Sequence, residues 1–158
     1  MLWNRYIGPG GIYAPVAARS QGMAAWTVPL ELETAPATQQ SFVLALTQAA
    51  GEPLAVWVNQ DVQSPGVIRT ARFDTAWGAP QSLPTNLGGR GDFAGSANGE
   101  AFGVWTEYDG ARYLVASAKR DSAGLWTRMP DVATTNTTID PGPVIATDDT
   151  GNAAALWV

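Results

Sequence analysis

Residues that could perform acid–base or binding chemistry gather in one short segment of the sequence. Glu107 and Asp109 flank Tyr108, and Arg112 and Tyr113 lie opposite, on the other side of the Asp109-Gly110 turn. Side chains two residues apart on a strand share a face, so the two carboxylates could serve a glycosidase, which needs two of them about 5 to 9.5 Å apart. A solvated hairpin tip with cross-strand charge pairing explains the same residues equally well. We therefore predict a ligand-binding cluster at these five positions and no catalytic residue.

The sequence contains no histidine and no cysteine. This absence excludes Ser-His-Asp triads, Cys-His pairs, disulfides and the usual zinc sites. Only carboxylate, tyrosine, arginine or lysine chemistry remains, and Lys119 is the single lysine. We accordingly predict that the protein is not an enzyme and uses no cofactor.

Two further short motifs could suggest ligands. Asp148-Asp149 lacks the alternating acidic spacing of a calcium loop, so we interpret it as a turn cap and predict no metal site. Arg90-Gly91-Asp92 spells the integrin-binding tripeptide, but so short a pattern arises often by chance, and Asp92 leads directly into a segment that reads as a strand.

The charge pattern limits the partners of the chain. The net charge is −5 and the nine basic residues are scattered, so the basic surface of a nucleic-acid binder is missing. No apolar run approaches the roughly 18 residues of a membrane span. The first residues lack the basic and apolar regions of a signal peptide. We predict neither a nucleic-acid nor a membrane partner.

A repeated sequence motif, called here the phrase, predicts the elements that must position these residues. A tryptophan stands six residues after a glycine three times, and the N-terminal Leu2-Trp3 matches the end of one more copy. A second tryptophan stands in each interval. The repeated residues are Gly51, Gly99 and Gly151, and the tryptophans Trp3, Trp26, Trp57, Trp77, Trp105, Trp126 and Trp157. Tryptophans could stack on sugars, but ones that recur in this way are better interpreted as wedges between neighbouring units.

Each interval of about fifty residues predicts four short antiparallel strands. The first strand covers 42–46, 93–94 and 143–147, and a tight turn that ends in glycine leads into the second strand, which contains the phrase. Turns at 8–11, 63–66 and 109–110 follow, and the last of these, Asp-Gly, is the strongest hairpin signal. The third strand ends in a basic residue, and the fourth is expected to begin at Trp26, Trp77 and Trp126, with linkers such as 134–138 behind it. The fold class predicted is all-β.

The segment from Pro143 to Trp157, with its Asp-Asp-Thr-Gly-Asn turn, resembles the repeat of a large group of bacterial β-propeller proteins. Val104 to Lys119 and Gly124-Leu-Trp126 continue the pattern. The resemblance implies propeller blades of sialidase-like shape, a bacterial protein that is exported or surface-associated, and in most cases no assigned activity. The Asp-box of sialidase-type blades, Ser-x-Asp-x-Gly-x-Thr-Trp, keeps only its tryptophan clearly here, which tells against sialidase chemistry.

We divide the single domain, 1–158, into repeats at approximately 4–57, 58–105 and 106–157. A propeller typically needs four to eight blades, so three repeats predict half of a six-bladed ring that two identical chains close. A fragment of a longer propeller and a β-trefoil-like threefold domain remain the alternatives.

The function predicted is a non-catalytic binding or scaffold module that self-assembles into a closed ring. Its expected partners are a second copy of itself and a glycan or protein ligand. A lectin-like propeller and a fragment of a carboxylate-based glycoside hydrolase or lyase are the alternatives.

Overall fold

The computed structural model describes residues 1–8, 12–20, 24–34, 39–61, 66–83, 85 and 90–158. In these residues the regular secondary structure consists of antiparallel strands, with no helix, so the all-β prediction is confirmed. Accordingly, this part of the chain holds no helix that is long and apolar enough to cross a membrane.

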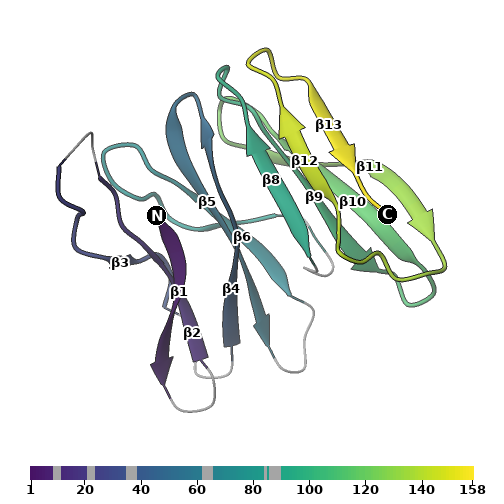
Figure 1. The fold of residues 1–158 in the computed structure, drawn as a ribbon, viewed down its shortest axis with the longest axis horizontal. Coiled ribbons are helices and arrows are strands. Elements are labelled where there is room, and N and C mark those ends of the chain that lie inside the picture. Colours follow the sequence, from purple (N-terminus) through teal and green to yellow (C-terminus); the bar gives the residue numbers. More distant parts are fainter. Residues whose placement is uncertain (9–11, 21–23, 35–38, 62–65, 84, 86–89) are drawn as a thin grey trace.

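The strands form four sheets that follow one another in chain order across the molecule (Figure 1). The first sheet consists of β1 (Leu2–Gly8), β2 (Ile12–Ala17) and β3 (Leu30–Glu31). The second sheet consists of β4 (Gln39–Ala49), β5 (Glu52–Asp61), β6 (Val67–Arg72) and β7 (Gln81–Ser82).

The third sheet consists of β8 (Gly91–Gly95), β9 (Ala101–Tyr108), β10 (Tyr113–Arg120) and β11 (Trp126–Thr135). The fourth sheet is the pair β12 (Val144–Thr147) and β13 (Ala153–Leu156). In the second and third sheets each strand pairs with the next one in sequence, the arrangement that short hairpin loops favour.

The predicted turns form where glycine supplies the backbone conformation. Gly51, Gly99 and Gly151 have φ values of 76°, 89° and 89°, a region that side chains with a Cβ rarely adopt. The Asp-Gly hairpin is also confirmed: Asp109 N–H donates to the carbonyl of Arg112, and Gly110 has φ 97°. The predicted turns at 8–11 and 63–66 lie largely outside the described residues.

The prediction for the fourth strand was right in one sheet and wrong in two. Trp126 opens β11, but Trp26 lies outside any strand and Trp77 forms only an isolated bridge with Phe73. β3 and β7 begin four residues after these tryptophans. In the second sheet Gly78 N–H donates to the carbonyl of Arg72. This hydrogen bond closes a short loop around Trp77, and regular pairing with β6 resumes only at β7. The segment 134–138, expected to be a linker, still belongs to β11 as far as Thr135.

The core lies between successive sheets. Trp57 is fully buried in a cluster with Ala17 and Leu32 of the first sheet region, and Trp105 is fully buried in a cluster with Leu54 and Ile68 of the second sheet. Each of these tryptophans therefore packs its own sheet against the preceding one.

The first strands of three sheets lie side by side. Gly95 N–H in β8 donates to Thr47 Oγ1 of β4 at 3.0 Å, and Thr147 Oγ1 of β12 donates to the Gly95 carbonyl at 2.9 Å. Figure 1 shows β8 and β12 next to each other along their length. Gly95 thus connects the first strands of the second, third and fourth sheets.

Candidate functional site

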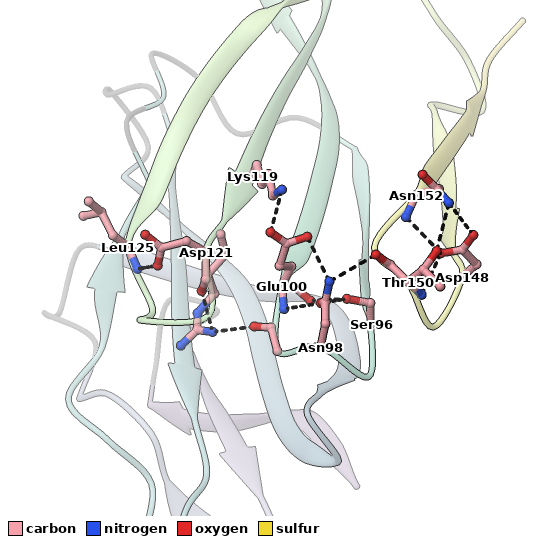
Figure 2. Close-up of polar contacts among 11 residues, drawn as sticks. Ser96, Asn98, Glu100, Lys119, Asp121, Leu125, Asp148, Thr150 and Asn152 are labelled. Carbon is pink, nitrogen blue, oxygen red and sulfur yellow. Dashed lines mark hydrogen bonds and ion pairs between the residues drawn. The ribbon is translucent and has the colours of Figure 1, made fainter.

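The turns before β9 and β13 form one edge of the molecule, and polar side chains connect them (Figure 2). Asp148 accepts four hydrogen bonds of 2.7 to 2.9 Å, from the backbone and the side chains of Thr150 and Asn152. These bonds, with those from Asn152 the largest contribution, hold the pKa of Asp148 well below its usual range. Both carboxylate oxygens of Asp148 thus cap its own turn, as the turn-cap interpretation expected.

Asn98 joins the two turns of this edge. Its Nδ2 donates to the Thr150 carbonyl at 3.2 Å, and its Oδ1 accepts the Glu100 N–H at 2.9 Å. Glu100 in turn pairs with Lys119 Nζ at 2.6 Å, and this hydrogen bond is the main reason that the pKa of Glu100 is lowered. Among the described residues no group of three carboxylates could hold a metal ion, and the polar atoms of this edge are engaged with one another (Figure 2).

The predicted binding cluster lies at the opposite ends of β9 and β10. The rings of Tyr108 and Tyr113 face each other with centroids 4.9 Å apart, and Tyr108 Oη donates to the Gly110 carbonyl. Asp109 accepts the N–H groups of Arg112 and Ala111, which lower its pKa. The structure therefore brings four of the five residues together on an exposed hairpin.

Glu107, the fifth residue of that cluster, faces elsewhere. It is 3% exposed, accepts the indole N–H of Trp105 at 2.7 Å and pairs with Arg128 at 2.9 Å. Burial disfavours the charge of Arg128, but its hydrogen bond to Asp131 and the charge of Glu107 outweigh this effect and raise the pKa of Arg128. Glu107 and Asp109 thus have separate partners, one buried and one in the turn, which is not the facing carboxylate pair that a glycosidase uses.

A second carboxylate, Glu33, has the same role as Glu107 and was not predicted from the sequence. Glu33 accepts the indole N–H of Trp57 at 3.1 Å, the Asn59 amide at 2.7 Å and the Arg69 guanidinium at 2.6 Å. The one available signal was the indole itself, since a buried N–H usually finds an acceptor. Neighbouring residues in the sequence could not show that Glu33 is the acceptor, because Glu33 follows the first sheet and Trp57 belongs to the second.

The Arg-Gly-Asp tripeptide is engaged within the fold. Asp92 accepts the N–H groups of Phe93 at 2.9 Å and Ile145 at 3.1 Å, and the second bond attaches β12 to β8. Arg90 pairs with Asp140 on the surface.

Two open cavities flank the outer sheets. The N-terminal cavity, about 670 Å³, lies between the first sheet region and β4, and its lining includes Ala18, Arg19, Trp26, Leu46 and Thr47. The C-terminal groove, about 550 Å³, lies between the third and fourth sheets, and its lining includes Phe102, Val104, Ser117, Met129, Ile145 and Trp157. The groove is mostly apolar, and Met129 and Trp157 remain 39% and 37% exposed in it.

Comparison with protein-family models, with curated proteins and with solved structures finds no match for this chain.

Proposed function

We propose that the chain is a non-catalytic binding or scaffold module, built from propeller blades, that closes a six-bladed ring with a second copy of itself. The observation that carries the proposal is the strand count of the sheets. Within the described residues, the second and third sheets have four strands each, whereas the first has three and the fourth has two. The two incomplete sheets are complementary, because the first lacks an inner strand and the fourth lacks outer ones.

The register of the strands supports this complementarity. Trp57 lies opposite Arg69, Trp105 opposite Ala116 and Trp3 opposite Val16. β1 therefore corresponds to the later part of β5 and β9. β12 and β13 correspond to the inner strand and the beginning of the second strand. One copy's fourth sheet and the other copy's first sheet would together form a complete blade.

The two cavities lie where this assembly needs space. The N-terminal cavity borders Ala18 to Ser20 and Thr47, and Thr47 already receives a hydrogen bond from Gly95 of the next inner strand. Thr147 would approach Thr47 of the second copy from the other side as β12 enters this cavity. Closing both junctions buries the open strand edges, which otherwise invite uncontrolled pairing.

At each junction, residues 1–4 of one copy and 155–158 of the other compete for the same stretch of the second strand. Leu2 packs against the buried cluster of Trp57, whereas Leu156 is 70% and Val158 86% exposed. The segment 155–158 is therefore the one that we expect to move aside.

Ligands of such a module would bind at the hairpin edge, which the β1–β2 and β9–β10 hairpins form. Two tyrosine pairs lie there, Tyr108 with Tyr113 and, in the first sheet, Tyr6 with Tyr13, whose ring centroids are 5.7 Å apart. In each pair one ring is exposed and the other half-buried. Both pairs sit directly opposite each other across a hairpin. Aromatic rings of this kind provide rigid contact area at low entropic cost.

Size-exclusion chromatography with light scattering tests the assembly. The expected mass is twice the chain mass of 16.6 kDa across the micromolar range. A stable monomer overturns the proposal, and so does a ladder of ever larger species, which indicates open head-to-tail growth without ring closure.

A further inference from the structure

Trp126 shows how this protein attaches one sheet to the preceding one. Its indole N–H donates to Thr70 Oγ1 of the second sheet at 3.1 Å, and its ring meets Phe93 edge to face at a centroid distance of 6.0 Å. The side chain is 7% exposed. Trp77 makes the corresponding contact between the second and the first sheet, because it packs against the buried cluster that contains Ala17.

Trp26 holds the same backbone position in the first sheet. Thr27 N–H donates to the Arg19 carbonyl at 2.8 Å, just as Gly78 N–H donates to the Arg72 carbonyl at 2.9 Å in the second sheet. Trp26 nevertheless remains 56% exposed, because none of the described strands forms a sheet ahead of β1.

The C-terminal groove presents the counterpart of the surface that receives Trp126. Thr70 follows Arg69, the residue opposite Trp57, and Ser117 follows Ala116, the residue opposite Trp105. Both positions carry a hydroxyl group. Ser117 Oγ donates to the Pro130 carbonyl, which leaves its oxygen free to accept a hydrogen bond.

We propose that Trp26 of one copy inserts into the C-terminal groove of a second copy, where its indole N–H donates to Ser117 Oγ. This inference rests on the proposed ring and names the contact that closes it. The apolar wall of Phe102, Met129 and Ile145 takes the indole ring, and the two-fold symmetry of the ring repeats the contact. A central, desolvated tryptophan with a satisfied N–H is the typical hot spot of an interface.

Sedimentation velocity on the full chain tests the contact from both sides. Trp26→Ala removes the inserted ring, and Met129→Arg puts a charge into the groove. Each is expected to raise the dimer dissociation constant at least about thirty-fold. The matched controls are Tyr108→Ala, an exposed aromatic on the hairpin edge, and Val67→Arg, whose parent side chain is 38% exposed against 39% for Met129. Neither control residue lines the groove, so both are expected to dimerise as the wild type does.

A mixture of the two variants gives the most direct test of the contact. The Trp26→Ala chain keeps an intact groove and the Met129→Arg chain keeps Trp26, so a mixed dimer restores one complete contact. The mixture is expected to form dimers at concentrations where each variant alone is monomeric, which also shows that both variants are folded. A mixture that associates no better than its components overturns the inference.

The hydrogen bond itself is tested by a double-mutant cycle. Trp26→Phe keeps a ring but removes the N–H, and Ser117→Ala removes the acceptor. Each is expected to weaken the dimer about five-fold, and the double variant is expected to be no weaker than either. Fully additive losses contradict the bond.

The two proposals fail in distinguishable ways. A monomeric wild type overturns the ring and this contact together. A dimeric wild type whose Trp26→Ala and Met129→Arg variants dimerise equally well leaves the ring standing and overturns the contact alone.

Discussion

At the scale of single residues, the recurring device is a buried tryptophan whose indole N–H meets a carboxylate held by an arginine. Trp105 has Glu107 and Arg128, and Trp57 has Glu33 and Arg69. A buried N–H without a partner costs free energy. A carboxylate that accepts it needs its own counter-charge. The arginine supplies that charge from a position that still reaches water.

Glu107→Ala should therefore destabilise the protein rather than abolish a reaction. The substitution leaves the Trp105 N–H unpaired and removes the buried one of the two acidic partners of Arg128, so we expect a loss of about 2 to 3 kcal/mol in the free energy of unfolding. Urea denaturation followed by fluorescence measures it. Glu31→Ala is the control, because its partner Arg5 is 49% exposed, and the loss expected there is below about 1 kcal/mol. Equal losses in the two variants would contradict the assigned role of Glu107.

At the scale of elements, the approach of neighbouring sheets depends on a small residue in the inner strand. A Cβ added at Gly95 would lie 2.0 Å from the Gln48 carbonyl oxygen. Because that oxygen belongs to the backbone of β4, it cannot move aside without moving the second sheet.

Gly95→Ala is accordingly expected to separate β8 from β4 and to cost about 3 kcal/mol, the upper range for overpacking. Gly78→Ala is the matched control, since its added Cβ would meet the Arg72 carbonyl at an ordinary 3.5 Å. Chemical denaturation of both variants gives the comparison. If Gly95→Ala unfolds at the wild-type midpoint, the close packing of the inner strands is wrong.

At the scale of the whole molecule, the four sheets of the described residues follow one another in an open series (Figure 1), and both ends of the series expose large apolar side chains. Val28 and Leu30 at one end are 87% and 53% exposed, and Leu156 at the other is 70% exposed. Large apolar side chains gathered beside open strand edges favour association with a complementary surface. In the proposed ring, the two ends of the chain would cover each other.

Association of this kind makes thermal stability depend on protein concentration. The melting temperature is expected to rise about 2 °C for each tenfold increase in concentration, given the unfolding enthalpy of a dimer of this size. Differential scanning calorimetry measures the trend, and the Met129→Arg variant should lose it. A melting temperature of the wild type that does not change with concentration contradicts a folded dimer.

The local parts of this structure could be predicted from the amino-acid sequence alone. The glycines at 51, 99 and 151 predicted the tight turns, because only their positive φ lets a strand reverse there. Asp109-Gly110 predicted the hairpin that presents Tyr108 and Tyr113. These features depend on residues close together in the chain, so propensity and turn chemistry suffice to find them.

Which side chains meet across sheets depends on the three-dimensional fold and could not be predicted from the sequence. Glu107 looked like one of two paired carboxylates, but its place beneath Arg128 makes it the acceptor for Trp105. Trp26 looked equivalent to Trp126, yet one is exposed and the other buried. The reason is physical: burial depends on the sheet that packs opposite, and the sequence of one repeat does not contain that neighbour.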